Sequence, residues 1–238
     1  MTRDQVVHAM DGNGIEKAIV QPFPGAPDAV QVHNEIAALG DSIGSRVLGL
    51  ASVNPHMDHA KYQAEIRRCV DDLGFVGVKL HTLGHAVHPV SDDALVVFET
   101  AAALGIVVMV HTGPGMPFAD PTHLLERARQ FPDTPIVLAH AGASASPGSA
   151  IAVAKQCDNI YLEPSWCKAT EVRAMINALG PDRVLFGTDT PENVRVELAK
   201  YEEIRLTEVE AAWVFGGTAT AVFGLRSGVD AELPRGGA

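Results

Sequence analysis

Three apolar runs of strand length in the sequence are each followed by a side chain that can bind a metal or transfer a proton. These side chains are His111, His140 and Asp189. The runs are apolar on both faces, which is typical of buried parallel strands. Because parallel α/β proteins keep their chemistry at the carboxyl ends of the strands, we expect the three side chains to share one site.

Two histidines and an aspartate are suited to metal-assisted chemistry. A catalytic zinc needs about three protein ligands and an open position for water, and the pKa of the bound water falls to roughly 7. An aspartate that touches metal and water can accept the proton, and a nearby histidine can protonate a leaving group. Nitrogen and oxygen ligands favour zinc, manganese or iron over copper(I).

Each of these residues also has a structural interpretation. A histidine at the end of a strand is often a core residue that bonds a backbone carbonyl, and Asp189 could cap the helix after Thr190 and Pro191. The presence of three such side chains after three strands favours the functional interpretation.

Further candidates lie at other strand ends. Lys79 and His81 are two residues apart, so on a strand they share one face. Lys79 could polarise a carbonyl or carboxylate of a substrate, or pair with an acidic neighbour in the core. Trp166 follows a strand end and could form the wall of a substrate pocket or pack against a helix. Residues 113–118 offer glycines for close backbone approach and an apolar wall.

Strand and helix patterns alternate along the chain, which predicts parallel strands joined by right-handed crossovers. Between the strands lie helical patterns, such as 92–104 with Ser91 as N-cap and Gly105 after it. We predict a TIM-type (β/α) barrel in which seven of eight strands are recognisable, as a single domain over residues 1–225 with a tail over 226–238. The seven predicted strands are 17–21, 47–53, 75–81, 106–113, 136–142, 159–163 and 183–189.

Composition excludes several functional classes. The net charge of −11 and the lack of a Lys/Arg cluster argue against nucleic-acid binding. No apolar run reaches about 18 residues, so we expect no membrane span. Three cysteines without pair spacing suit a reducing cytoplasm. We therefore expect a cytoplasmic protein that acts on a small molecule, and exposed apolar helix faces would allow a homo-oligomer.

The sequence resembles the amidohydrolase superfamily, in the amidohydrolase-related branch that contains enzymes of the aminocarboxymuconate-semialdehyde decarboxylase type. The resemblance extends from about residue 3 to residue 225. Five short sequence segments, spaced as the strands of a barrel would be, support this resemblance together. These segments are 49–55, 77–81, 108–113, 137–142 and 185–191.

The resemblance implies a (β/α)8 barrel with a divalent metal, usually zinc and otherwise manganese, at the carboxyl end of the strands. It implies His111 and Asp189 as metal ligands, with Asp189 also handling the proton of the attacking water. His140 would be an acid/base residue. Lys79 joins these as a catalytic candidate, and His81 and Trp166 are substrate-binding candidates.

The sequence departs from the family at its first strand. That strand ends in a His-x-His pair that supplies two ligands, and no such pair occurs in this sequence. The seven predicted strands correspond to family strands two to eight. If Met1 is the true start, we expect a barrel that is open at the missing strand and covered there by the helix at 3–10 or by a neighbouring chain. A start further upstream would restore the strand.

The remaining histidines are weaker candidates. His81, His85 and His88 could together replace the absent pair, but Gly84 and Pro89 indicate a solvated loop. Five others fall on helices or loop tips and are not candidates: His8, His33, His56, His59 and His123.

Three functions follow as hypotheses. The first is metal-dependent hydrolysis of a small cyclic or aromatic acid, amide or lactone by metal-activated water. The second is metal-dependent decarboxylation of a small aromatic or unsaturated acid. The third is a truncated, catalytically impaired family member with a scaffold or assembly role.

Overall fold

A curled sheet of six parallel strands organises the protein. The computed structural model describes residues 2–113 and 118–225, and in this part of the chain the strands pair in sequence order. The expected tail at 226–238 and most of the expected apolar loop at 113–118 lie outside the described residues. The strands are β1 (Ala18–Val20), β2 (Val47–Ala51), β3 (Gly77–Leu80), β4 (Val107–His111), β5 (Ile136–Ala139) and β6 (Ile160–Glu163).

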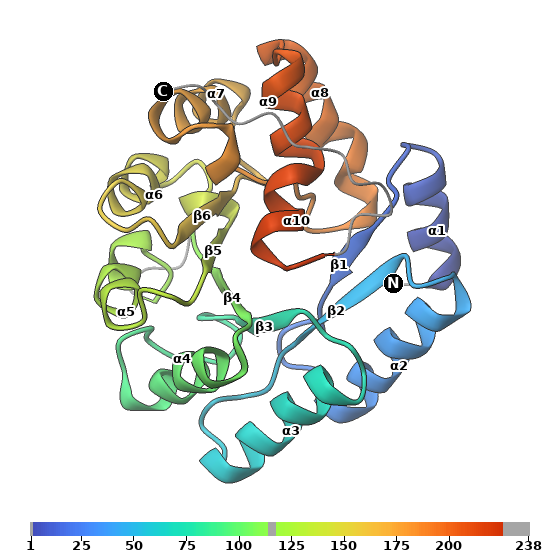
Figure 1. Ribbon diagram of the computed structural model, residues 1–238, viewed down its shortest axis with the longest axis vertical. Helices are drawn as coiled ribbons and strands as arrows, with labels where there is room; N and C mark the ends of the chain where they lie inside the picture. The colour runs from blue at the N-terminus through green and yellow to red at the C-terminus, as the bar shows by residue number, and fades with distance from the viewer. Residues whose placement is uncertain (1, 114–117, 226–238) are drawn as a thin grey trace.

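Helices surround the convex face of the sheet, and one further helix lies inside its curve (Figure 1). Ser91 caps one of the outer helices by accepting a hydrogen bond from the amide of Ala94, and Gly105 ends this helix at φ 63°, as the sequence predicts. None of the described helices combines the length and the apolar character needed to cross a membrane. The helices are α1 (Arg3–Asp11), α2 (Ala29–Ser42), α3 (His59–Asp71), α4 (Asp92–Leu104), α5 (Leu124–Gln130), α6 (Pro147–Ala154), α7 (Ala169–Leu179), α8 (Val194–Ile204), α9 (Glu208–Ala212) and α10 (Thr218–Val222).

The predicted seventh strand, at 183–189, is not a strand among the described residues. Its contact with β6 is a single bridge between Leu162 and Val184. The amide of Leu185 donates to the carbonyl of Leu162, and the next amide, of Phe186, lies on the other edge of the segment and donates to the carbonyl of Val214. The segment is thus bonded to β6 on one edge and to the helical segment Trp213–Gly217 on the other. The architecture is therefore an α/β fold with a six-stranded part of a barrel.

The concave face of the sheet is filled by α10. Phe223, Val222 and Ala219 pack against side chains that point inward from the strands, among them Leu50 and Val137. In Figure 1, α10 lies inside the curve of the sheet and next to β1. This helix covers apolar surface that a closed barrel would bury with its own strands.

The helix α1 lies at the opening of the sheet. It packs on the outer side of β1 and β2 through Val6 and Met10, and it also contacts the short helix η4 (Pro191–Asn193) that follows the last extended segment. The expected cover by the first helix is therefore partial, since the concave side is filled by α10.

Candidate functional site

The carboxyl ends of β3, β4 and β6 place polar side chains on the concave face. In the register of the sheet, Lys79 of β3 is opposite Met109, while His111 of β4 is opposite Ala139, which is in turn opposite Glu163 of β6. Side chains alternate between the two faces of a strand. The neighbours Val78, Leu80 and Val110 accordingly belong to the outer core.

Three histidines form a cluster above this row. The rings of His81 and His111 stack with centroids 4.3 Å apart, and the ring of His140 meets His111 edge-on at 5.0 Å. The structure thus brings together all three histidines that the sequence selects.

His111 has both ring nitrogens buried, and neither has a hydrogen-bond partner among the described residues. Burial, followed by the charges of His140 and Lys79, lowers the pKa of His111 to about 3. The imidazole is therefore neutral at pH 7 and keeps one nitrogen lone pair free. A buried polar atom without a partner is rare and marks a position where a ligand is expected.

His81 differs from His111 because one of its nitrogens is occupied. Its Nδ1 accepts a hydrogen bond from the amide of Gly84 at 2.9 Å. Burial, followed by the neighbouring His111, lowers the pKa of His81 to about 3. A neutral imidazole that accepts at Nδ1 has its proton at Nε2. This ring can therefore donate a hydrogen bond to a substrate but is poorly prepared to bind a metal.

His140 is held by two side chains that the sequence analysis did not select, Glu163 and Ser165. Its backbone amide donates to Glu163 Oε2 at 3.2 Å, and its Nδ1 lies 2.7 Å from Ser165 Oγ. The backbone of His140 has φ 66°, a strained conformation for a residue other than glycine. Burial, followed by the charge of Lys79, lowers the pKa of His140 to about 4.

Glu163 is buried and accepts three hydrogen bonds. Besides the amide of His140, it accepts from the amide of Ser165 at 2.9 Å and from Ser165 Oγ at 3.0 Å. Burial raises its pKa, and these donors together with Lys79 oppose the rise. The sequence offers one sign that Glu163 belongs to the site, which is a charged residue at the end of the predicted strand 159–163. The register of the sheet then aligns this residue with His111.

Lys79 is almost completely buried, with 2% of its surface exposed. Burial lowers its pKa to about 8, and the nearby carboxylates of Glu163 and Asp189 limit the fall. Lys79 thus lies in the core near two carboxylates, as the structural interpretation expects, and also beside the three histidines, where its role in catalysis stays a prediction.

Asp189 and Trp166 complete the cluster on its exposed side. Trp166 Nε1 donates a hydrogen bond to Asp189 Oδ2 at 2.9 Å. Both residues have left-handed backbones, with φ 66° for Trp166 and 62° for Asp189. Strained residues of this kind gather at functional sites. The cap interpretation of Asp189 finds no support, because the helix η4 that follows has no side-chain cap.

The loop after β3 is folded back rather than solvated, which corrects one expectation. His85 is 7% exposed, and its amide and that of Val87 bond the carbonyls of His81 and Thr82. Short-range backbone bonds of this kind close the loop on itself and bury the ring. His88 is half-buried and lies against His123, with ring centroids 4.3 Å apart. Neither ring joins the cluster of His81, His111 and His140.

The donors of this cluster fit a divalent cation. His111 has a nitrogen lone pair without a partner, and the carboxylate of Asp189 has lone pairs beyond the one that Trp166 uses. With the histidines neutral, one ammonium and two carboxylates give the cluster a net negative charge. Neutral imidazole and carboxylate are ligands of zinc and manganese. His111 and Asp189 would supply two ligands, one fewer than is usual for a catalytic zinc.

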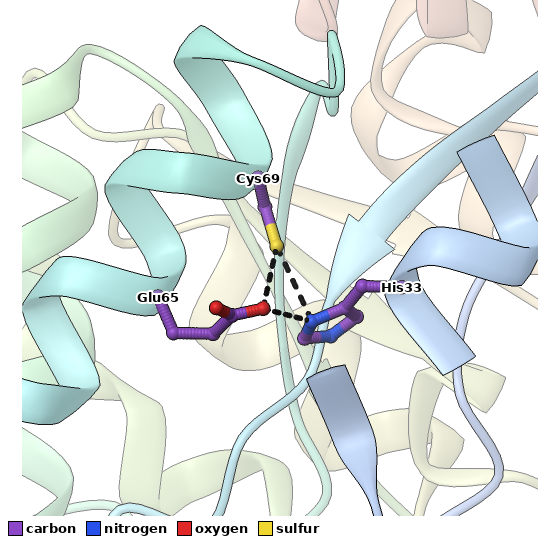
Figure 2. A group of neighbouring side chains, drawn as sticks. All are labelled: His33, Glu65 and Cys69. Carbon is purple, nitrogen blue, oxygen red and sulfur yellow. Dashed lines mark hydrogen bonds and ion pairs between the residues drawn. The ribbon is translucent and has the colours of Figure 1, made fainter. Parts of the chain in front are cut away.

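A second group with metal-ligand chemistry lies outside the sheet, between α2 and α3. Figure 2 shows His33, Glu65 and Cys69 pointing toward one another, and His33 Nδ1 lies 2.7 Å from Glu65 Oε1 and 3.3 Å from Cys69 Sγ. His33 Nε2, however, accepts the amide of Ser52 at 3.0 Å. A neutral imidazole that accepts at Nε2 carries its proton on Nδ1, toward Glu65.

This second group is therefore better described as a closed hydrogen-bond network. The guanidinium of Arg68 bonds both carboxylate oxygens of Glu65, at 2.7 and 2.8 Å. Burial of Glu65 is outweighed by its bonds to Arg68, His33 and Cys69, which lower its pKa to about 2. A metal would have to displace the Nδ1 proton next to an existing cation. The network instead fixes the end of β2 through Ser52.

The fold and the site define a parallel α/β protein with a histidine and carboxylate cluster at the carboxyl edge of its sheet. A family model described as amidohydrolase matches residues 20–225. The chain belongs to this family, which confirms the resemblance found in the sequence. None of the curated proteins matches the chain.

Solved structures with the same fold include several decarboxylases. The 2,6-dihydroxybenzoate decarboxylase from Rhizobium is 18% identical, with a TM-score of 0.78 over 94% of this chain and 89% of that chain. A dihydroxybenzoic acid decarboxylase from Polaromonas sp. JS666, with bound manganese and the inhibitor 2-nitroresorcinol, is 21% identical, with a TM-score of 0.77 over 95% and 87%. The 5-carboxyvanillate decarboxylase from Sphingomonas paucimobilis is 17% identical, with a TM-score of 0.76 over 95% and 84%.

Gly187 gives a direct test of how tightly Glu163 is held. A Cβ atom at Gly187 would collide with Oε1 and the side-chain carbons of Glu163, whereas a Cβ atom at Gly148 would meet nothing within 4 Å. We expect Gly187→Ala to lower the free energy of unfolding by about 1–3 kcal/mol, the usual cost of overpacking. Gly148→Ala is the matched control and should leave the stability unchanged or slightly higher. Urea denaturation measures both, and equal stabilities of the two variants would contradict this account of the site.

Proposed function

We propose that this chain is a metal-dependent decarboxylase that acts on a small hydroxylated aromatic acid. The three similar structures described above support the choice of decarboxylation, since all three are decarboxylases of aromatic acids and one of these three contains manganese. The observation that carries the proposal in this chain is Lys79, a buried ammonium with a pKa lowered to about 8 within a cluster of neutral histidines.

Decarboxylation requires a general acid that delivers a proton to the ring carbon, whereas hydrolysis requires a metal-activated water as nucleophile. The bond between the ring carbon and the carboxylate breaks, its electron pair stays on the ring carbon, and that carbon takes up a proton as CO2 leaves. A general acid works best when its pKa is close to the operating pH. The pKa of Lys79 meets this condition, whereas His81 and His111, with pKa values of about 3, are already deprotonated.

The other residues of the cluster bind and orient the acid. His81 would donate its Nε2 proton to the substrate carboxylate, and the exposed indole of Trp166 would cover one face of the ring. His140 would accept a hydrogen bond from a ring hydroxyl through Nε2. His111 and Asp189 would hold the divalent cation, which when bound supplies positive charge that attracts an anionic substrate.

Metal binding by wild-type protein and three variants tests the first half of the proposal. We expect about one equivalent of manganese or zinc in wild type by elemental analysis after dialysis. His111→Ala and Asp189→Asn should each lose it. Cys69→Ala is the control, because it disrupts the group of His33, Glu65 and Cys69 and should retain the metal. Loss of metal only in Cys69→Ala would place the cation between α2 and α3 and overturn this assignment.

Release of CO2 by the manganese-loaded protein tests the second half. The substrates are 2,6-dihydroxybenzoate and 5-carboxyvanillate, taken from the names of the similar enzymes. Release from either one, lost in Lys79→Met, supports the proposal. Hydrolysis remains the second candidate because the matching family is described as amidohydrolase. Turnover of amides or lactones without CO2 release would favour it, and turnover of neither class would favour the scaffold role.

A further inference from the structure

Three buried side chains form a hydrogen-bond chain that ends at the ring of His140. Ser165 Oγ lies 2.7 Å from His140 Nδ1 and donates to Glu163 Oε2 at 3.0 Å. We propose that Ser165 and Glu163 are positioning residues that hold His140 in the tautomer with its proton on Nδ1, so that the Nε2 lone pair faces the reaction. This inference rests on the proposed function and assigns the state of one of its residues.

The direction of the chain follows from the charge of Glu163. Three hydrogen-bond donors converge on its carboxylate, and the ammonium of Lys79 lies nearby. Burial raises the pKa of Glu163, but the three donors and the ammonium oppose the rise, and both carboxylate oxygens already act as acceptors. An ionised carboxylate can only accept hydrogen bonds. The single proton of the Ser165 hydroxyl is therefore committed to Glu163. The oxygen of Ser165 can then only accept a hydrogen bond from the N–H at His140 Nδ1.

Ser165 separates the ring of His140 from the carboxylate of Glu163. His140 Nδ1 and Glu163 Oε2 are 3.9 Å apart, which is too long for a direct hydrogen bond. Glu163 thus controls the ring through a neutral hydroxyl and does not form an ion pair with it. A neutral imidazole carries one proton, so a proton fixed on Nδ1 leaves Nε2 as an acceptor.

The backbone of His140 is held by the same carboxylate that orients its ring. Glu163 binds the amide of His140, whose φ is 66°, as well as the amide of Ser165. The same carboxylate therefore fixes the main chain of His140 and the partner of its ring. Gly187 leaves the space that this carboxylate occupies. A histidine that merely fills the core needs one hydrogen-bond partner, not a strained backbone held by the same group.

The tautomer can be read directly by nuclear magnetic resonance. In metal-free protein with 15N-labelled histidine at pH 7, long-range 1H–15N spectra distinguish the protonated from the unprotonated ring nitrogen. The signals of His140 are those lost in His140→Asn. We expect the Nδ1–H tautomer in wild type and a shift of the population toward Nε2–H in Ser165→Ala. Ser144→Ala is the matched control, since Ser144 bonds Trp166 and Glu171 but not His140.

The outcomes separate this inference from the proposed function. The Nε2–H tautomer in wild type, or an unchanged Nδ1–H tautomer in folded Ser165→Ala, would overturn it. The wild-type spectrum decides by itself if Ser165→Ala does not fold. Because no metal or substrate is present, an inactive enzyme with the Nδ1–H tautomer would refute decarboxylation and leave the tautomer assignment intact. In an active enzyme, we expect Ser165→Ala to lower kcat about 10- to 100-fold with little change in KM.

Discussion

Replacement of Lys79 by methionine is expected to reduce CO2 release by about 100-fold or more, since general acid catalysis typically contributes at least that factor. Methionine has a similar length and keeps the buried volume filled, but it has no proton to give. Lys155→Met is the matched control, because Lys155 is exposed at the end of α6. Loss of activity in both variants, or in neither, would show that Lys79 is not the acid.

The pH profile of the same reaction supplies a second check on Lys79. An acid must be protonated to act, so activity should be present below its pKa and fall as the pH rises through it. The alkaline limb of kcat/KM is expected at about 8 or lower, since a bound cation disfavours the ammonium further. A profile that stays flat to pH 10 would exclude this role.

The second large effect is a steep loss of stability in acid for the metal-free protein. The pKa values of His81, His111 and His140 fall to about 3, 3 and 4 in the folded state, from 6.5. Between pH 6.5 and about 4 the unfolded chain therefore binds protons that the folded protein does not. The free energy of unfolding is therefore unaffected by these three histidines above pH 6.5, where they are neutral in both states. It decreases as the pH falls through this window.

Urea denaturation at a series of pH values measures this linkage. The slope of the unfolding free energy against pH reports the number of protons taken up on unfolding. His111→Asn should give a shallower slope than wild type, because one of the three histidines no longer contributes. His8→Asn, on the exposed side of α1, should leave the slope unchanged. An identical slope in wild type and His111→Asn would mean that His111 is not held neutral by the fold.

Much of the histidine cluster could be predicted from sequence because it follows from the period of a strand. His111 and His140 come directly after apolar runs, and Lys79 and His81 share a face at a spacing of two residues. Parallel pairing then places these strand ends at one edge of the sheet. The carboxylate of Asp189 could be placed in the same way, although the segment before it makes only one bridge with β6.

What the sequence could not predict depends on contacts between distant segments. Ser165 has no periodic signal, and its role is visible only once β5 and β6 are paired and its hydroxyl meets His140. His33 lies on a helix and would pass for a surface residue, yet it is fully buried against Glu65. The predicted seventh strand also depends on distant contacts, since it makes one bridge with β6 and the amide of Phe186 bonds Val214 on its other edge.

The position of α10 has a consequence for how the protein is made. The inward faces of β2 and β5 are covered by side chains at 219–225, which leave the ribosome long after those strands. During synthesis the strands can pair and their outer helices can dock, but the apolar interior beneath the histidines stays exposed to water. Exposed surface of this kind is where partly folded chains aggregate. The interior beneath the candidate site is therefore among the last parts to be buried, and we expect a chain that stops before α10 to aggregate more readily than the full chain.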